Sequence, residues 1–459
     1  MRKFYTVLAL LMVVSFALTA CATPTAAPTA APTAAPTAAP TAAPTAAPTA
    51  VEVTLNPYLG SNKLDGNGIP PTFFDDVHIR KAIAYCFDFQ TLIDEVYMGE
   101  AVQSVTLSLP GMAGYDVNAP HYTYDLAQCE AEFKLADIDK DGIAAGDETD
   151  GTDIWNMGFR FQMLYNTGNT TRQIYTEIVS SNLAAVNPKF VVETLGLPWP
   201  SYLAAQRAHK VPMMTGGWLE DIHDPHNWYQ PYTTGTYGGR QNLPDDLKTQ
   251  FKALLDEGVS LIDFNARAEV YKQFNQLYYE QAVGIPLVLA TSHAYEQKWV
   301  TGRVMNPIYS DIYYYPISKA AGAKNPDVFT LVTTGSPDTL DPALSYDTAS
   351  GEIIQNVYET LVFYDGESTS KFIPQLAVEV PTVENGGISA DGTVWTFNIR
   401  PDVKFHNGDT LTATDVAYSF QRGLLQGGYS SPQWRLAEPC FGVGKDDITM
   451  SGDDGASAD

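Results

Sequence analysis

Basic residues are scarce in this chain. Its 459 residues include 27 Lys and Arg against 53 Asp and Glu, which gives a formal charge of −26 at pH 7. A chain this acidic is a poor partner for nucleic acid or for an anionic lipid surface. We interpret the charge as a feature that keeps an exported protein soluble, with a weak preference for cationic ligands as the alternative.

Cysteine is also scarce, and the motifs of common enzymes are missing. The four cysteines, of which three follow Cys21, have no paired metal-ligand spacing. Three thiols cannot all pair within one chain, so buried free thiols are expected, with one disulfide as the alternative. No nucleophile elbow, paired-acid motif or phosphate loop occurs in the sequence, and we therefore do not expect an enzyme.

Long apolar runs are confined to the start of the chain. An apolar stretch from Val7 to Ala17 follows Arg2 and Lys3, which is typical of a secretory signal and too short for a spanning helix. The next residues, LTAC, resemble the bacterial lipobox, in which cleavage leaves the cysteine first and acylated. Residues 1–20 are therefore predicted to be a lipoprotein signal peptide and Cys21 to be lipidated, with a plain secretory signal as the alternative.

Residues 21–50 have the composition of a tether. From Pro24 to Pro48 a proline recurs at every fourth position among Thr and Ala, and no residue in this tract can form a core. The composition predicts an extended, partly polyproline-like linker. The remaining length is enough for two or three domains with large buried cores.

Hydrophobic periodicity predicts alternating helices and strands, and therefore an α/β fold. Acidic residues at the start and helical spacing of apolar residues predict one capped helix over residues 73–98. Alternation predicts strands over other segments, and Thr412 with Asp415 resembles a capping box. The expected strands are residues 159–166, 285–290, 327–334 and 394–400, residues 349–365 are expected to form a helix that continues into a strand, and the other expected helices cover residues 170–186, 247–255, 270–278 and 414–424.

A family resemblance is carried by four quoted segments. Residues 390–420, ADGTVWTFNIRPDVKFHNGDTLTATDVAYSF, resemble the signature of family 5 extracellular solute-binding proteins, the peptide-binding subunits of ABC importers. FFDDVHIRKAIAY, GGWLEDIHDP and NPIYSDIYYYPISK, all earlier in the chain, resemble the later half of that family. The resemblance implies a two-lobed, type II periplasmic-binding-protein-like fold.

The order of these segments is unusual for the family, which implies a circularly permuted and shortened chain. On this interpretation residues 51–316 are the later half and form mainly the C-terminal lobe. Residues 317–326 are the permutation joint, and residues 327–459 are the family's N-terminal segment in a partial N-terminal lobe. Missing neighbours would leave apolar faces of residues 394–400 and 414–424 exposed. A gene rearrangement or a faulty gene reconstruction is the alternative explanation for this order.

The resemblance also implies ligand-binding residues. Asp221 matches the position whose carboxylate takes a peptide amino terminus, and Trp218 packs beside it. Tyr346 and Thr348 would line the opposite wall of the cleft between the lobes. The alternative for Asp221 is a residue that only caps a turn.

Two metal sites are conceivable from residue spacing. DIDKDGIAAGDE, residues 137–148, places Asp137, Asp139, Asp141 and Glu148 at the spacing of a calcium loop, with a solvated acidic loop as the alternative. A further set contains His223 and His226 with two nearby aspartates, Asp221 and Asp224, and offers transition-metal ligands. Histidines in such a loop more often serve as hydrogen-bonding residues.

The expected function is a monomeric, lipid-anchored substrate-binding protein of an ABC importer at the outer face of the bacterial cytoplasmic membrane. It would capture peptides between two lobes and deliver them to a permease. No cofactor is required for this function, and the only ion considered with it is a structural calcium ion in the acidic loop. The alternatives are a non-transporting surface lipoprotein or rearranged remnant without effective ligand binding, and a binder of nickel or another metal complex.

Overall fold

The computed structural model describes residues 55–261, 263–291, 293–333, 335–426 and 433–441. The chain divides into two units, Met1–Thr54 and Leu55–Asp459, and the described residues all belong to the second. The predicted signal peptide, the predicted tether and Cys21 lie outside the described residues. Within the described ranges, no helix combines the length and the apolar character needed to cross a bilayer.

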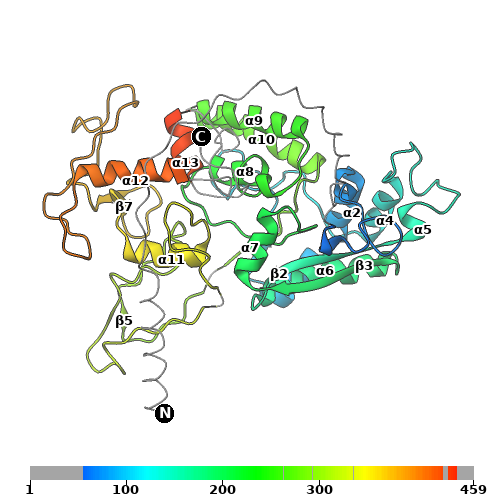
Figure 1. Ribbon diagram of the computed structural model, residues 1–459, viewed down its shortest axis with the longest axis horizontal. Helices are drawn as coiled ribbons and strands as arrows, with labels where there is room; N and C mark the ends of the chain where they lie inside the picture. The colour runs from blue at the N-terminus through cyan, green and yellow to red at the C-terminus, as the bar shows by residue number, and fades with distance from the viewer. Residues whose placement is uncertain (1–54, 262, 292, 334, 427–432, 442–459) are drawn as a thin grey trace, which may run out of the picture. The chain divides into compact units, whose positions relative to one another are not determined.

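A parallel strand–helix–strand unit contains the strand predicted over residues 159–166 and the helix predicted over residues 170–186, followed by a second strand that the sequence analysis did not predict. Strand β2 (Phe159–Asn166) pairs in parallel with β3 (Phe190–Leu197), and helix α6 (Thr170–Val186) connects them and packs along both (Figure 1). Residues of β2 are buried mostly in alternation, because successive side chains of a strand point to opposite faces. Asn169 caps α6 by accepting a hydrogen bond from the backbone N–H of Arg172. The predicted α/β class is confirmed here.

Aromatic rings and a disulfide form the core beside this unit. The rings of Phe159 and Phe190 stack with centroids 4.5 Å apart, and both side chains are fully buried. Helices α2 (Val77–Cys86) and α4 (Leu126–Leu135) pack together and are joined by the disulfide Cys86–Cys129. The expectation of buried free thiols is therefore wrong: Cys86 and Cys129 form the disulfide that was the alternative, and Cys440 is free but exposed.

The single helix predicted over residues 73–98 is wrong. The chain forms a short 3₁₀ turn, η2 (Phe73–Asp75), then α2, and leaves helical geometry at Phe87. Asp88 then caps a new turn by accepting from the backbone N–H of Thr91, because a short acidic side chain competes for backbone donors. The segment continues as α3 (Phe89–Thr91) and the π-helical turn η3 (Leu92–Val96).

A second, aromatic core is built by three helices. In it the ring of Tyr229 stacks on that of Tyr271 at 4.9 Å, and Phe251 packs against Phe274 at 4.8 Å. The helices predicted over residues 247–255 and 270–278 are confirmed, the third helix was not predicted, and the strand predicted over residues 285–290 is confirmed only in its last three residues. The elements are α8 (His226–Thr233), α9 (Asp245–Ser260) and α10 (Phe264–Glu280), with β1 (Ala101–Gln103) antiparallel to β4 (Val288–Ala290).

The segments on either side of the predicted joint pack against each other. The Asn306 side chain donates to the carbonyl of Gly366 at 2.7 Å, and that of Asn356 donates to the carbonyl of Ile312 at 2.8 Å. Two residues of the predicted joint form β6, so the joint contains a short strand. The elements here are β5 (Val300–Thr301) antiparallel to β6 (Ser318–Lys319), α11 (Thr348–Val357), β7 (Val362–Tyr364) antiparallel to β8 (Phe372–Pro374), α12 (Ala413–Gln426) and α13 (Trp434–Phe441).

Two strands predicted in this part of the chain are wrong. Residues 327–333 form no strand, and between residues 394 and 400 only Trp395 and Ile399 make isolated bridges. A strand pattern needs a neighbouring strand to pair with, and no described strand lies against these segments. The predicted exposure of the apolar faces of residues 394–400 and 414–424 is confirmed for Trp395, which is 57% exposed, and for Tyr418 and Phe420, which are 62% and 44% exposed.

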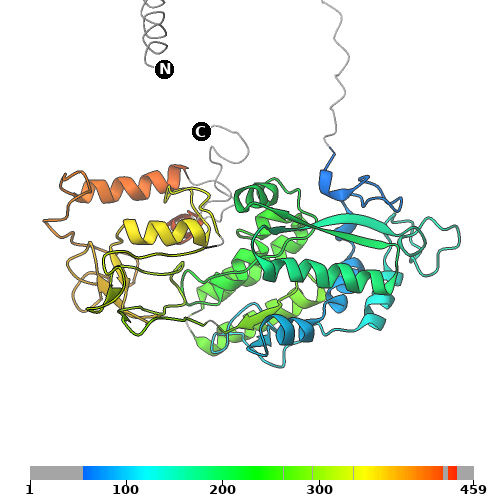
Figure 2. The same ribbon diagram turned by 90° about the horizontal axis from the view of Figure 1, so that it is seen from below.

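The cap predicted for α12 is confirmed. The carboxylate of Asp415 accepts hydrogen bonds from both the backbone N–H and the hydroxyl of Thr412, at 2.8 and 2.6 Å. Both Figure 1 and Figure 2 show α12 lying near α11. The remaining short elements are η1 (Pro57–Leu59), α5 (Ile154–Met157), α7 (Trp199–Arg207) and η4 (Gly238–Arg240).

Candidate functional site

The loop that carries Asp221 is held by the start of helix α8. The side-chain oxygen of Asn227 accepts from the backbone N–H of Asp221 at 2.7 Å, and its amide nitrogen donates to Asp221 Oδ2 at 3.1 Å. Asn227 is almost completely buried, so the residues around it hold its side chain in place beside the loop. The indole nitrogen of Trp218 also lies 3.4 Å from the Asn227 side-chain oxygen. Asn227 therefore orients both predicted ligand residues of this loop.

The far end of the same loop is fixed by an ion pair. The two terminal guanidinium nitrogens of Arg267, Nη1 and Nη2, donate to the carboxylate of Asp224 at 2.9 and 2.8 Å; Arg267 belongs to helix α10. Burial is the largest single influence on the pKa of Asp224 and raises it, but the hydrogen bonds from Arg267 and from the backbone of His226, together with the charges nearby, outweigh burial and the pKa is lowered. Asp224 stays ionised at neutral pH and anchors the loop.

Groups from the C-terminal part of the chain complete the surroundings of Asp221. The Tyr346 hydroxyl donates to Asp221 Oδ2 at 2.8 Å, and the Tyr364 hydroxyl donates to the backbone carbonyl of Asp221 at 3.2 Å. Arg435 of α13 forms an ion pair with the same carboxylate. The Trp218 ring meets the Tyr346 ring edge to face, with centroids 5.7 Å apart. The half-buried Asp221 carboxylate therefore lies beside aromatic side chains from two segments that are far apart along the chain.

The structure brings three of the four predicted ligand residues together. Tyr346 contacts both Trp218 and Asp221, which also share the side chain of Asn227, whereas Thr348 is exposed at the start of α11. Asp221 does more than cap a turn, because its carboxylate receives side chains from distant segments. Sequence reasoning missed Asn227, Tyr364 and Arg435, none of which belongs to a motif that would have marked it.

The predicted transition-metal set is not assembled. His223 Nδ1 lies 2.9 Å from a carboxylate oxygen of Glu220, and the backbone N–H of His226 donates to Asp224. In the part of the chain that the structure describes, only Asp137, Asp139 and Asp141 form a cluster of three or more such side chains close enough to share an ion. In these contacts the His223 side chain bonds to a carboxylate, and His226 contributes its backbone N–H at the start of α8.

The acidic loop has the donors of a hard-cation site. One ligand oxygen from each of Asp137, Asp139 and Asp141 lies within 4.8 Å of the others. The backbone N–H of Gly142, a glycine with a φ of 90°, donates to Asp137 at 3.0 Å. The pKa of Glu148 is raised by desolvation and then by the charges of Asp141 and other acids of the loop. Carboxylate oxygens are the ligand type that calcium prefers, and the three aspartates supply part of the six to eight oxygens that it takes.

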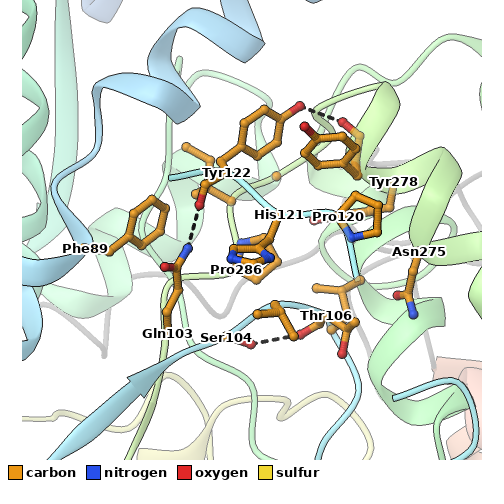
Figure 3. Close-up of a pocket in the computed structure, with 15 residues that line it drawn as sticks. Phe89, Gln103, Ser104, Thr106, Pro120, His121, Tyr122, Asn275, Tyr278 and Pro286 are labelled. Atoms are coloured by element: carbon orange, nitrogen blue, oxygen red, sulfur yellow. Dashed lines mark hydrogen bonds between the residues drawn. The ribbon is translucent and has the colours of Figure 1, made fainter. Parts of the chain in front are cut away.

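A small pocket lies elsewhere, beside β1 and α10 (Figure 3). Aromatic rings and backbone segments line it, and several of its polar groups bond within the protein, such as Gln103 to the carbonyl of Tyr122 at 2.6 Å. None of the four predicted ligand residues lines this pocket. It therefore adds nothing to the site around Asp221.

Comparison with known proteins connects this site to a family. The model of bacterial extracellular solute-binding proteins, family 5 Middle, matches residues 25–240 and 371–455. The dipeptide-binding protein of Escherichia coli is 30% identical over 239 residues, which are 51% of this chain and 41% of that protein. The heme-binding protein A of Haemophilus influenzae is 26% identical over 241 residues, 52% of this chain and 41% of that protein.

A solved structure is similar over a comparable share. The periplasmic binding protein DppA of Helicobacter pylori, in complex with the peptide STSA, is 21% identical and has a TM-score of 0.41. The likeness covers 53% of this chain and 43% of that one. This chain spans about two-fifths of the length of the curated relatives that it matches.

Proposed function

Because the chain belongs to family 5 of the bacterial extracellular solute-binding proteins, we propose that it captures peptides with a free amino terminus for an ABC importer. The observation that carries this proposal is the half-buried carboxylate of Asp221, held by Asn227 and faced by Trp218 and Tyr346. Relatives named as dipeptide-binding and oligopeptide-binding proteins support a peptide ligand.

The chemistry of the site suits an ammonium group. An ionised carboxylate is a strong acceptor, and a charge-assisted hydrogen bond is worth roughly 1.5–3 kcal/mol. The aromatic faces of Trp218 and Tyr346 exclude water from one side and favour a cation near their rings. A peptide amino terminus would bind Asp221, while Thr348 and the backbone near it would contact the rest of the peptide.

Thermal unfolding with and without short peptides tests this function. At a peptide concentration of about 100 times Kd, binding should stabilise the purified protein by about 2.7 kcal/mol and raise its Tm. The same peptides with an acetylated amino terminus should give a much smaller shift, because the ammonium is gone. Equal shifts for blocked and unblocked peptides would contradict the role of Asp221. No shift with any peptide would support the non-transporting alternative.

Export and anchoring belong to the same proposal. The apolar run before LTAC and the repeat that follows support lipidation at Cys21, with residues 21–50 holding the folded part away from the membrane. A permease in that membrane would receive the peptide, and the protein would act as a monomer. Membrane fractionation of cells that produce the protein or its Cys21→Ala variant tests the anchor.

The permuted order remains part of the proposal as well. Packing of residues 306–315 against the segment after the joint supports a lobe built from both sides of it. The exposed apolar side chains of α12 support an incomplete lobe. These same exposed faces favour the second candidate, a surface lipoprotein or remnant that does not transport.

We further propose that the loop of Asp137, Asp139, Asp141 and Glu148 binds a structural calcium ion. The clustering of three carboxylates in this loop supports the proposal. Calcium would neutralise their mutual repulsion and order the loop between α4 and α5.

Calcium should therefore raise the Tm of the protein relative to the same sample in EDTA. A saturating concentration of about 100 times Kd corresponds to about 2.7 kcal/mol. The shift should disappear in Asp139→Asn/Asp141→Asn and persist in Asp147→Asn, a neighbouring exposed acid outside the four ligands. Differential scanning calorimetry measures the shift, and an unchanged Tm in the wild-type protein would rule the site out.

A further inference from the structure

Arg435 already makes the contacts that a ligand's cation would make at the proposed site. Its guanidinium pairs with the Asp221 carboxylate and lies over the ring of Tyr346, with its central carbon 5.3 Å from the ring centroid. Burial lowers the pKa of Arg435 to about 9, which still leaves the group cationic at neutral pH. A cation against a carboxylate and above an aromatic face is the arrangement proposed for the peptide ammonium.

The helix that carries Arg435 is seated on its own part of the chain. The Gln433 side chain donates to the carbonyl of Ala343 at 3.0 Å, and Ala437 is completely buried. The segment that contains Ala343 continues to Tyr346, so α13 rests beside one wall of the site. Arg435 reaches from this seat to Asp221, which belongs to the loop before α8.

The Asp221 carboxylate oxygen that pairs with Arg435 also accepts two other hydrogen bonds. Asp221 Oδ2 accepts from the Tyr346 hydroxyl at 2.8 Å and from the Asn227 amide at 3.1 Å, and Arg435 pairs with the same atom. Of these three donors, only Arg435 carries a charge. A ligand ammonium bound to the same carboxylate would lie close to the guanidinium, and two like charges at one carboxylate repel each other.

We propose that Arg435 is an internal competitor of the ligand, so that a peptide's amino terminus must displace it from Asp221. This inference rests on the proposed function and adds a regulatory contact to it. A group tethered within the same chain acts at an effective concentration in the millimolar range. The apparent Kd for peptide then equals the Kd of the open site divided by the fraction of molecules in which Arg435 has left Asp221.

The Arg435→Gln variant tests the competition. Calorimetric titration with one unblocked tripeptide at fixed salt should give a Kd roughly tenfold lower than for the wild-type protein, or lower still. Arg400→Gln is the matched control, because Arg400 is an exposed arginine of the same part of the chain, near Glu359 at 3.9 Å. Its Kd should stay at the wild-type value. Binding that is unchanged or weaker in Arg435→Gln would overturn the inference and leave the proposed function standing.

A second measurement examines the contact without any ligand. The Tm shifts of Arg435→Ala and Asp221→Asn should together exceed the shift of the double variant, because both remove the same pair. Additive shifts would show that the contact is absent, and the inference would fail. If the shifts are coupled but neither the wild-type protein nor Arg435→Gln binds peptide, the proposed function fails and the competition with it.

Discussion

Replacing Asp221 with asparagine should weaken the binding of unblocked short peptides by roughly ten- to a hundredfold. The substitution keeps the shape of the side chain but removes the charge that the peptide ammonium would meet. The loss of a charge-assisted bond of roughly 1.5–3 kcal/mol corresponds to this change in Kd. Calorimetric titration of the two proteins with the same tripeptide measures it.

The structure offers a close control for this substitution. Asp338 also bridges distant segments, through an ion pair with Arg207 at 3.0 Å, and its side chain is about as buried as that of Asp221. Asp338→Asn should therefore leave the Kd within about twofold, since only local stability changes. The effect of Asp221→Asn should be larger in an Arg435→Gln background, where no internal cation competes. An Asp221→Asn protein that binds like the wild type would place the amino terminus elsewhere.

Removing the Cys86–Cys129 disulfide should lower the free energy of unfolding by about 4 kcal/mol. The two cysteines are separated by 43 residues along the chain, and the loop-entropy relation gives about this value for a loop of that length. Both cysteines are completely buried where α2 packs on α4, so alanine also leaves small gaps in the core. Urea unfolding of Cys86→Ala/Cys129→Ala under non-reducing conditions measures the loss.

The exposed Cys440 supplies the control for this second prediction. Cys440→Ala should change the free energy of unfolding by no more than about 0.5 kcal/mol, as is usual for a surface substitution. The wild-type protein in a strong reductant should unfold at the same urea concentration as the double variant. A loss below about 1 kcal/mol in both experiments would mean that the pair contributes little to stability.

Local sequence patterns predicted several helices and one strand correctly. β2, α6, α9 and α10 were predicted because each shows a clear apolar period along the chain. In contrast, residues 394–400 have the alternation of a strand but form only isolated bridges. A strand's pattern shows which face is apolar, but it cannot show whether another strand lies beside it.

The candidate site was predicted only in part, because only some of its residues lie in recognisable sequence motifs. Trp218 and Asp221 belong to one short motif, and Tyr346 lies in a segment that resembles the same family, so all three were available from sequence. Asn227 and Arg435 were not, because neither a spacing nor a motif connects them to Asp221. Their roles follow only from the hydrogen bond and the ion pair that they make with it.

The sequence by itself determined the family, the α/β class and the acidic, aromatic character of the loop around Asp221, because these properties are local to short segments. Only the tertiary structure decided that Cys86 pairs with Cys129 and that a cation of the chain's own, on Arg435, lies against the Asp221 carboxylate. Both contacts join residues far apart along the chain. Whether two such distant charges or thiols come into contact depends on how the helices between them pack. The apolar period of a single segment carries no information about that packing.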